Sequence, residues 1–183
     1  MTSVSRCAWA QGDPVMAEYH DAEWGIPVRD PRLLWEMLVL EGFQAGLSWR
    51  TILHRRDGFR RAFDGFDPAT IAVYDTDKIE ALMQDEGIIR ARAKIEATIG
   101  NARAYLRMNE EGRDFSQFVW SFVGGETQVN DGTNIPASTQ ASAALSKALK
   151  AEGFKFVGPT IAYAFMQAVG MVDDHEPGCF RRA

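Results

Sequence analysis

The chain has 183 residues and a mass of 20.4 kDa, which is the size of one domain. Its two cysteines are too few for a disulfide-dense secreted fold. Lysine and arginine number 20 against 25 aspartates and glutamates, and the resulting net charge of −5 argues by itself against a nucleic-acid binder. The N-terminus has no signal-peptide pattern and no apolar run could span a bilayer, so we expect a cytoplasmic protein with reduced thiols.

Helix start and stop signals recur along the chain and predict an all-α fold. Asp30-Pro31 and Asp67-Pro68 each place an N-cap residue before a proline at the first helical position. Further starts are expected at Thr76, near residue 92 for a long helix to about 108, at Asp114, at Ser138 or Ser142, and at Gly158-Pro159 with an end near Gly170.

Strand patterns are almost absent, and residues 124–136 predict an irregular surface loop because they are rich in Gly, Asn, Thr and Asp. We therefore expect a single domain over residues 1–183. Irregular terminal arms at 1–30 and 171–183 would flank a helical core of about 31–170, arranged in two lobes.

The two arms hold four residues of the kinds that bind zinc, which are Cys7, His20, His175 and Cys179. The His-x3-Cys spacing lets one turn present two ligands to one ion, whereas the Cys-x12-His spacing is looser. Three alternatives compete with zinc: a disulfide, which a reducing cytoplasm disfavours, two unrelated buried thiols, and histidines that have ordinary surface or capping roles. A bound zinc ion would tie the chain ends together and play a structural part, without a position for water.

Aromatic residues gather in the first 49 positions, beside an unusually placed acid. Trp9, Tyr19, Trp24 and Trp49 lie in or next to loop-like segments, where they either form a binding surface or pack the N-terminal arm. Glu41 ends an apolar run, so it is either a helix-end surface residue or a partly buried functional acid. A carboxylate beside aromatic faces can recognise a flat cationic group.

Positive charge is concentrated in two segments despite the negative total. Residues 50–61 contain five arginines and one aspartate, and residues 90–107 contain five basic residues and one glutamate. Such segments are either solvated helix surface or contacts for a phosphate backbone. The second segment follows Gly87, where we expect a tight turn between two helices whose free N–H groups can bind a phosphate.

Two strings of the sequence are specific, Gln44-Ala45-Gly46-Leu47-Ser48-Trp49 and Gly153-Phe154-Lys155-Phe156-Val157-Gly158. Further distinctive segments are Arg6-Cys7-Ala8-Trp9, Tyr19-His20-Asp21, Glu23-Trp24-Gly25, Leu40-Glu41-Gly42, Gly87-Ile88-Ile89-Arg90, residues 99–105, Phe118-Val119-Trp120-Ser121-Phe122, Phe165-Met166-Gln167-Ala168 and Asp174-His175. With these segments, the whole chain resembles the bacterial 3-methyladenine DNA glycosylase I family of the helix-hairpin-helix superfamily.

This resemblance implies a helix-hairpin-helix glycosylase fold in which one structural Zn²⁺ joins the terminal arms through Cys7, His20, His175 and Cys179. It implies a base pocket lined by Glu41, Tyr19 and Trp49, with Trp9 and Trp24 nearby and Glu41 as the candidate catalytic acid. It also implies that Gly46 and Leu47 enter the gap left by an extruded nucleotide. The Gly87 hairpin, with Arg90 and Arg92, would hold the DNA backbone.

The activity implied is that of a monofunctional DNA-3-methyladenine glycosylase of base-excision repair. Such a monomer would flip the damaged nucleotide out of double-stranded DNA and hydrolyse the N-glycosidic bond of its alkylated adenine. Met16 departs from the family pattern, which has tyrosine there, so a hydroxyl hydrogen bond is lost while packing against a flat ring is kept. Two other classes stay open: a module that binds alkylated or abasic DNA without cutting, and a zinc-containing interaction protein with no DNA role.

Overall fold

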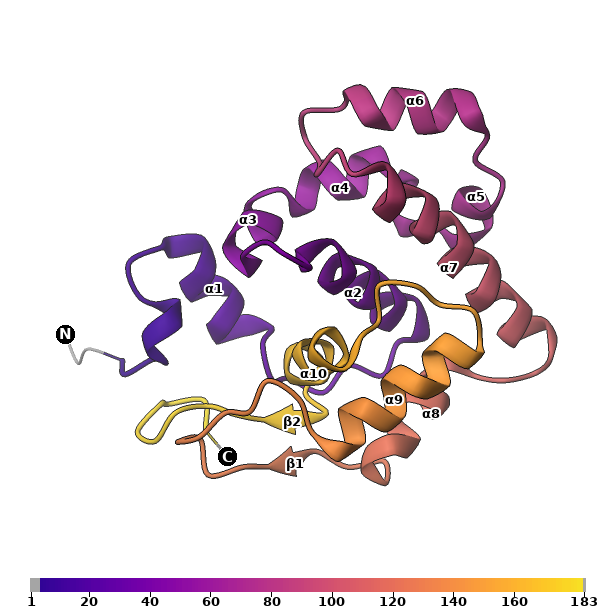
Figure 1. Cartoon of the computed structure of the whole chain (residues 1–183). Coiled ribbons are helices and arrows are strands. Elements are labelled where there is room, and N and C mark those ends of the chain that lie inside the picture. The colour runs from indigo at the N-terminus through magenta and orange to yellow at the C-terminus, as the bar shows by residue number, and fades with distance from the viewer. Residues whose placement is uncertain (1–3, 183) are drawn as a thin grey trace.

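A computed structural model describes residues 4–182 and shows a helical protein built around one central helix, α2 (Pro31–Gln44) (Figure 1). Pro31 occupies the first turn of α2, and the Asp30 carboxylate accepts a hydrogen bond of 2.7 Å from the backbone N–H of Leu33, as predicted. Every residue from Leu34 to Phe43 is buried. A helix that is buried on all sides has other elements packed against each of its faces.

Two groups of helices lie on either side of α2 (Figure 1). One group comprises α3 (Trp49–His54), α4 (Arg56–Ala62), the 3₁₀ turn η2 (Asp64–Phe66), α5 (Pro68–Ala72), α6 (Thr76–Gln84) and α7 (Arg92–Glu110). The other comprises α8 (Phe115–Trp120), η3 (Ser121–Val123), α9 (Gln140–Ala151) and α10 (Pro159–Ala168). The helices predicted after Asp67, near residue 92, after Asp114 and after Gly158 are all present.

Two helix caps differ from the prediction by one or more residues. Helix α6 is capped by Asp75, whose carboxylate accepts from the Lys78 N–H at 2.9 Å, so Thr76 is the first helical residue. Helix α9 is capped by Thr139, and Ser142 completes a capping box by accepting from the Thr139 N–H. Ser, Thr and Asp are similar caps, and the sequence alone does not rank neighbouring candidates.

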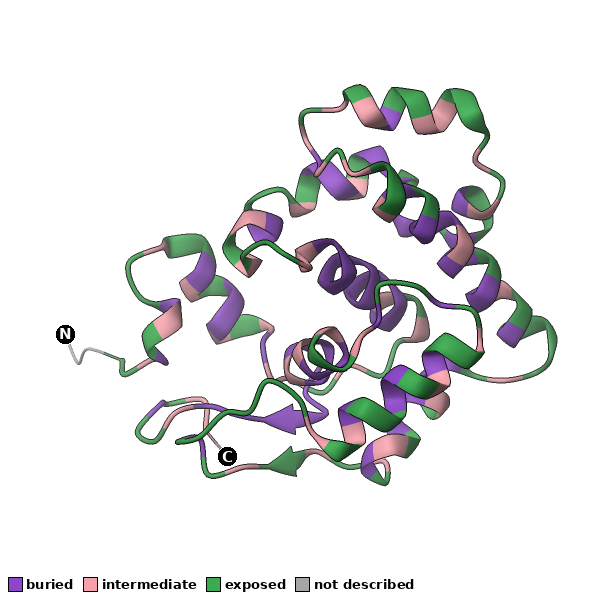
Figure 2. Ribbon diagram, viewed as in Figure 1, coloured by how far each residue is buried: buried purple, intermediate pink, exposed green. Residues whose placement is uncertain are grey.

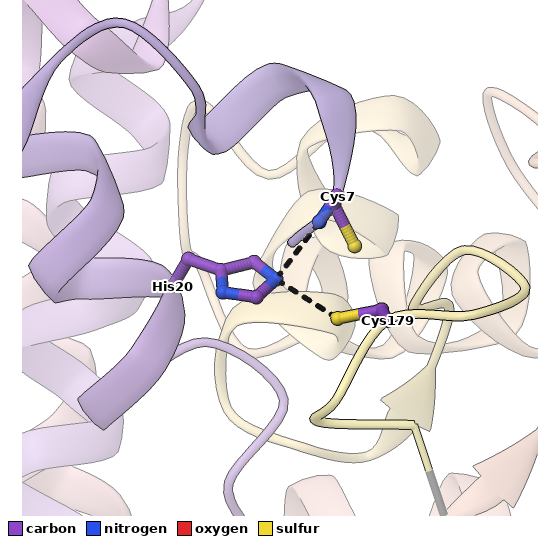
Figure 3. A group of neighbouring side chains, drawn as sticks. All are labelled: Cys7, His20 and Cys179. Carbon is purple, nitrogen blue, oxygen red and sulfur yellow. Dashed lines mark hydrogen bonds between the residues drawn. The ribbon is translucent and has the colours of Figure 1, made fainter. Parts of the chain in front are cut away.

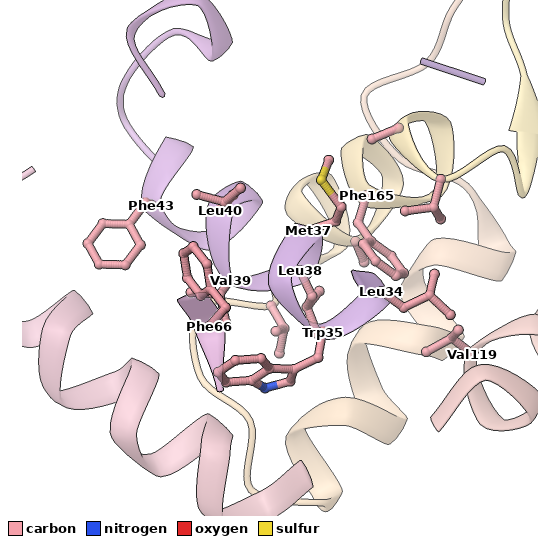
Figure 4. Close-up of a cluster of buried hydrophobic side chains, with 14 of the residues drawn as sticks. Leu34, Trp35, Met37, Leu38, Val39, Leu40, Phe43, Phe66, Val119 and Phe165 are labelled. Atoms are coloured by element: carbon pink, nitrogen blue, oxygen red, sulfur yellow. The ribbon is translucent and has the colours of Figure 1, made fainter. Parts of the chain in front are cut away.

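The core is continuous across both groups of helices, because α2 sends side chains in several directions (Figure 4). Trp35 and Phe66 meet with their ring centroids 6.2 Å apart. On another side Leu34 lies near Val119 and Phe165, both fully buried. Buried positions follow the inner faces of the surrounding helices, while the outer faces of α6 and α9 are exposed (Figure 2).

The N-terminal arm is more regular than predicted. It contains a 3₁₀ turn, η1 (Ala8–Ala10), and a helix, α1 (Pro14–Ala22). Asp13 caps α1 by accepting from the Val15 N–H at 3.0 Å, so Asp13-Pro14 is the same start signal as Asp30-Pro31. The prediction of an irregular arm over residues 1–30 was wrong for this segment; residues 1–3 lie outside the part described.

A small parallel sheet joins the long loop to the C-terminal arm. Strands β1 (Gln128–Val129) and β2 (Val172–Asp173) pair with Gln128 opposite Val172. The all-α prediction missed this pair, because two-residue strands have no alternation to detect. Nothing between residues 4 and 182 forms a helix of the length and apolar character that crossing a membrane requires.

Candidate active site

A cavity of about 260 Å³ opens between α1, α2, α3 and α10. Its lining includes every residue predicted for the pocket and four that were not, and comprises Trp9, Met16, Tyr19, Trp24, Glu41, Gln44, Trp49, Ile135, Ala164 and Gln167. These side chains come from widely separated segments of the chain, so only the tertiary fold brings them together.

Aromatic rings form one wall of the cavity. The Trp9 ring meets Trp24 edge to face with centroids 5.0 Å apart, and the Tyr19 and Trp49 centroids are 5.4 Å apart at 44°. Met16 adds a buried thioether to this wall. Tyr19 lies within α1 and Trp49 is the first residue of α3, so the loop placement predicted for Tyr19 was wrong. A wall of ring faces suits a flat, apolar or cationic ligand.

Glu41 is the only acid that lines the cavity among the described residues, and it is 3% exposed. The surface position considered for it from sequence is therefore wrong. Its Oε2 atom has no hydrogen-bond partner within residues 4–182, and burial raises the pKa of its carboxyl to about 8. Glu36 on the same helix is equally buried, but Arg32 at 3.1 Å and Arg60 at 2.7 Å pair with it.

Two more buried polar atoms near Glu41 lack partners within the described chain, the Tyr19 hydroxyl and the Trp49 Nε1. Burial, followed by the nearby Glu41 charge, raises the pKa of Tyr19 well above its ordinary value, so its hydroxyl stays a donor. Unpaired buried polar groups are costly in a folded protein and are typical of sites that a ligand completes. The cavity thus offers ring faces, two donors and one acid.

Four lining residues were not predicted: Gln44, Ile135, Ala164 and Gln167. Gln44 and Gln167 stand in strings that supported the family resemblance, but nothing local assigned them to a pocket. Gln167 is oriented by its Nε2, which donates to Asp174 Oδ2 at 2.9 Å. Ile135 belongs to the predicted surface loop and reaches the cavity only through the folding of that loop.

The segment after α2, residues 45–48, projects from the surface beside the cavity. Gly46 has a φ of 77°, a conformation that favours glycine, and Leu47 is 44% exposed. Ser48 then caps α3 by accepting from the Thr51 N–H at 3.2 Å. Lys94 on α7 donates to the carbonyl oxygens of Phe43 at 2.8 Å and Ala45 at 2.6 Å, which fixes the base of this segment. We call residues 45–48 the wedge segment.

The predicted hairpin is present as α6, a turn over residues 85–91, and α7. The Asp85 carboxylate accepts from the Gly87 N–H at 2.7 Å. Gly58 on α4 lies against this turn so closely that an added Cβ would be 2.3 Å from the Gly87 carbonyl oxygen. Arg92 forms an ion pair of 2.6 Å with Glu80, which lies on α6. The turn is therefore held from two sides.

Much of the positive charge in the two basic segments is paired within the fold. Arg50 pairs with Asp13 and Arg56 forms two bonds of 2.6 and 2.7 Å to Glu23. In the second segment, Arg103 and Arg107 donate to backbone carbonyls rather than projecting freely. The local charge excess counted from sequence therefore overstates what is available to a DNA backbone.

Three of the four residues predicted for zinc come together from both ends of the chain, and the fourth, His175, lies beside His20. Donor atoms of Cys7, His20 and Cys179 all lie within 4.8 Å of one another, and all three residues are buried (Figure 3). The His20 and His175 rings are 5.2 Å apart, and His175 Nε2 is buried without a hydrogen-bond partner in residues 4–182. Both cysteines are free thiols, so the disulfide alternative is wrong here.

Neighbouring acids orient the two histidines. His20 Nδ1 lies 2.8 Å from Asp21 and His175 Nδ1 lies 2.7 Å from Asp173. The His20 contact leaves its Nε2 atom facing Cys7 and Cys179, 3.4 Å from the Cys179 Sγ, and a histidine held by an acid through Nδ1 is a common arrangement in metal sites. The cluster also supports the cavity wall, because Trp9 packs on His20 at 5.3 Å and Trp24 on His175 at 4.7 Å.

The helical fold and the buried acid among aromatic rings form a cavity suited to a flat heterocyclic ring, beside the exposed segment 45–48 and the hairpin of α6 and α7. The family model of methyladenine glycosylases matches residues 9–182, and the chain belongs to this family.

Relatives and solved structures agree over nearly the full length. The chain is 55% identical over 179 residues to DNA-3-methyladenine glycosylase 1 of Escherichia coli K12, covering 96% of each chain. A crystal structure of 3-methyladenine DNA glycosylase I (TAG) matches with a TM-score of 0.96 and 53% identity, over 98% of this chain and 100% of that one. A substituted form of a 3-methyladenine DNA glycosylase I in complex with 3-methyladenine matches with a TM-score of 0.90 and 34% identity, over 97% and 99%.

Proposed function

We propose that this chain is a DNA-3-methyladenine glycosylase, which excises the alkylated base from DNA. The observation that carries the proposal is the buried Glu41, which faces a cavity walled by Trp and Tyr rings and whose Oε2 has no hydrogen-bond partner within residues 4–182. Family membership and the activities of the relatives support the same conclusion. Because one chain forms the whole cavity, the proposed enzyme works as a monomer, and its free thiols suit the cytoplasm.

The cavity selects a cationic base through the acid and the rings. An adenine alkylated at N3 carries a positive charge, which an aromatic wall and a carboxylate both favour. Glu41 is mostly protonated in the empty cavity at pH 7, because burial raises its pKa to about 8. A bound cation favours the ionised form, so recognition of the charged base releases a proton from Glu41. An ordinary, neutral adenine does not offer this interaction.

The chemistry follows from the charge of the lesion. When the N-glycosidic bond breaks, the electron pair goes to the base, which leaves as a neutral molecule, and water then adds to the sugar. No acid is needed to protonate the leaving group. The protein instead has to extrude the nucleotide, at a cost of about a few kcal/mol, and to hold it while the sugar becomes cationic. Glu41, as a carboxylate, stabilises that positive charge.

The wedge segment and the hairpin form the DNA-binding side of the proposed enzyme. Leu47 is exposed beside the cavity and suits the gap that the extruded nucleotide leaves. The hairpin turn, with Gly87 and Arg90, presents backbone N–H groups at the start of α7 to a phosphate of double-stranded DNA. Arg92 is committed to Glu80, so we assign it a smaller share of the binding than Arg90.

The Cys/His cluster is proposed to hold one structural zinc ion. The donor types fit this ion, because Cys7, His20 and Cys179 already place three ligand atoms within 4.8 Å of one another, and His175 beside them would complete a common set of two thiols and two imidazoles. Burial raises the pKa of the Cys7 thiol to about 12, so a metal-free thiol stays protonated and a cation is required to form the thiolate. Zinc bound there joins the chain ends and takes no part in the reaction.

A base-release assay on methylated duplex DNA tests the proposal against its rival, a module that binds without cutting. We expect release of 3-methyladenine, with strong loss in Glu41→Gln and in Trp49→Ala. Tight binding of abasic or alkylated DNA without release would favour the rival. Met16→Tyr then shows whether the missing hydroxyl is the reason, because this substitution restores a donor at the cavity wall. DNA binding that is absent or independent of salt would exclude both the glycosylase and the module that binds without cutting.

A further inference from the structure

The loop between α9 and α10, residues 152–158, carries an exposed aromatic ring on a strained backbone. Phe156 has a φ of 55°, which residues other than glycine rarely adopt, and it is 38% exposed. Phe66 has the same φ of 55° but is fully buried, so its packing offsets the strain. At Phe156 the ring is only partly packed. Strain that packing does not explain is typical of functional positions.

The backbone of this loop is held firmly on both sides of the ring. Asn101 on α7 accepts from the Lys155 N–H at 2.8 Å and donates to the Lys155 carbonyl oxygen at 3.1 Å. Phe154 and Val157 are buried, and they anchor the loop on either side of Phe156. The loop also lies against Gly42, where an added Cβ would be 3.2 Å from the Phe156 carbonyl oxygen. Phe156 is thus presented by a rigid support.

Phe156 lies beside the wedge segment. The Lys94 ammonium is 5.9 Å from the centre of the Phe156 ring and 2.6 Å from the carbonyl oxygen of Ala45 in the wedge segment. Figure 1 shows the loop between α9 and α10 passing across α2 toward α7. The ring therefore stands next to the wedge segment and next to the helix that follows the hairpin turn.

Phe156 does not belong to the base cavity. Glu41 and Gln44 line that cavity, whereas their neighbour Gly42 contacts Phe156, so the cavity and the ring lie on different sides of the end of α2. When one nucleotide occupies the cavity, the rest of the duplex lies against the surface that carries Leu47. An exposed ring beside the wedge segment, with the positive charges of Lys94 and Lys155 close by, suits the face of a base.

We propose that Phe156 is a second insertion residue, which stacks on a base that stays in the duplex beside the extruded nucleotide. The proposal rests on the DNA glycosylase function proposed above. Leu47 fills the gap in this arrangement, and Phe156 supports a neighbouring base that has lost its stacking partner. The rigid, strained loop holds the ring ready, so that little ordering is needed when DNA binds.

Three substitutions test the role of the ring. Phe156→Gly and Phe156→Asn remove the ring and tolerate a positive φ, whereas Phe156→Tyr keeps the ring as a matched control. Each is measured for melting temperature, for affinity to free 3-methyladenine through tryptophan fluorescence, and for affinity to a duplex with a tetrahydrofuran abasic site at fixed salt. Duplexes with 2-aminopurine opposite the abasic site or next to it report stacking.

We expect the two ring-less variants to keep the wild-type melting temperature and affinity for the free base. Their affinity for the abasic duplex falls about 5- to 150-fold, the effect of removing one ring–base stack. The 2-aminopurine fluorescence rises in at least one duplex, and Phe156→Tyr behaves as the wild type. Wild-type duplex affinity and unchanged fluorescence in both ring-less variants would overturn the proposal. Failure of the wild type itself to bind 3-methyladenine or release it would instead overturn the glycosylase function.

Discussion

Two glutamates on one buried helix have opposite surroundings. Glu36 is neutralised by Arg32 and Arg60, whereas Glu41 faces the cavity without a partner in the described chain. A buried carboxyl with no counter-charge destabilises the empty protein once it ionises, and proteins keep such groups mainly where a ligand supplies the charge. Under the proposed function, the cationic lesion supplies the positive charge that Glu41 lacks in the described chain.

The stability of the protein should report this missing partner. The pKa of Glu41 is about 8 in the folded chain and has its ordinary value of 4.5 when the carboxyl is exposed. The folded state holds the proton more tightly, so the free energy of unfolding falls as pH rises from 4.5 to above 8. Glu41→Gln should equal the wild type near pH 4 and exceed it by about 2 to 4 kcal/mol at pH 8.5. Urea unfolding of the wild type and of Glu41→Gln at the two pH values measures these free energies.

Glu36→Gln is the control for that experiment, because its partners keep the Glu36 charge compensated. This variant should be less stable than the wild type at pH 8.5, since it leaves Arg32 and Arg60 without their acid. A Glu41→Gln variant with the same stability difference at both pH values would show that the Glu41 carboxyl does not change its ionisation in this range.

Local patterns at single residues predicted part of the site. Glu41 was recognisable as an acid at the end of an apolar run, but its burial depends on helices that pack around α2 from far along the chain. The ion pairs of the basic residues were likewise not predictable from local sequence, because their partners come from distant parts of the chain. Arg56 meets Glu23 and Arg60 meets Glu36 through the fold, so charge counted along the sequence overstated the free positive surface.

At the scale of elements, the contact between α4 and the hairpin turn has little tolerance for change. A Cβ at Gly58 would lie 2.3 Å from the Gly87 carbonyl oxygen, so Gly58→Ala must displace the turn. We expect a loss of about 1 to 3 kcal/mol in stability. We also expect weaker binding to duplex DNA, with the affinity for free 3-methyladenine unchanged. Denaturation, DNA titration and base titration separate these effects.

Gly100→Ala is the matched control for the hairpin, because no other part of the described chain comes within 4 Å of an added Cβ at this position of α7. Alanine favours a helix over glycine by about 0.8 to 1 kcal/mol, so this variant should be neutral or slightly more stable. Equal DNA affinity for Gly58→Ala and Gly100→Ala would contradict the role given to the hairpin turn.

The elements themselves were largely predictable, and the errors have physical causes. Aspartate–proline pairs marked the starts of α2 and α5 correctly, since the side chain and the fixed φ act locally. The same signal at Asp13-Pro14 was passed over, although the helix that it starts, α1, is longer than α5. The β1–β2 pair joins residues more than forty positions apart, and no local signal exists for it.

At the scale of the whole molecule, the chain ends support the cavity. The Phe180 N–H donates to the Ser5 carbonyl oxygen at 3.0 Å, and the Ala8 N–H donates to Glu176 at 2.9 Å. The Cys/His cluster lies between these contacts, and its histidines back the rings of Trp9 and Trp24. Ordering of the ends and shaping of the cavity wall are therefore linked.

Removal of the proposed zinc should lower the stability of the protein and its affinity for the base together. Under reducing conditions, a chelator should lower the melting temperature by about 5 to 10 °C, as a loss of about 2 to 3 kcal/mol does in a chain of this size. The affinity for 3-methyladenine should fall at the same time, and added zinc should restore both. Metal analysis should give one ion per chain. Purified protein that lacks zinc yet keeps its stability and base affinity would contradict the metal assignment.

The most direct test of the account is base release from methylated duplex DNA by the wild type and Glu41→Gln, measured side by side. We expect the wild type to release 3-methyladenine. Glu41→Gln should release it about 10- to 150-fold more slowly, the effect of losing one charged hydrogen bond to the base. Equal rates for the two proteins, or no release by the metal-loaded wild type, would contradict the central claim that Glu41 in the aromatic cavity recognises the alkylated base for excision.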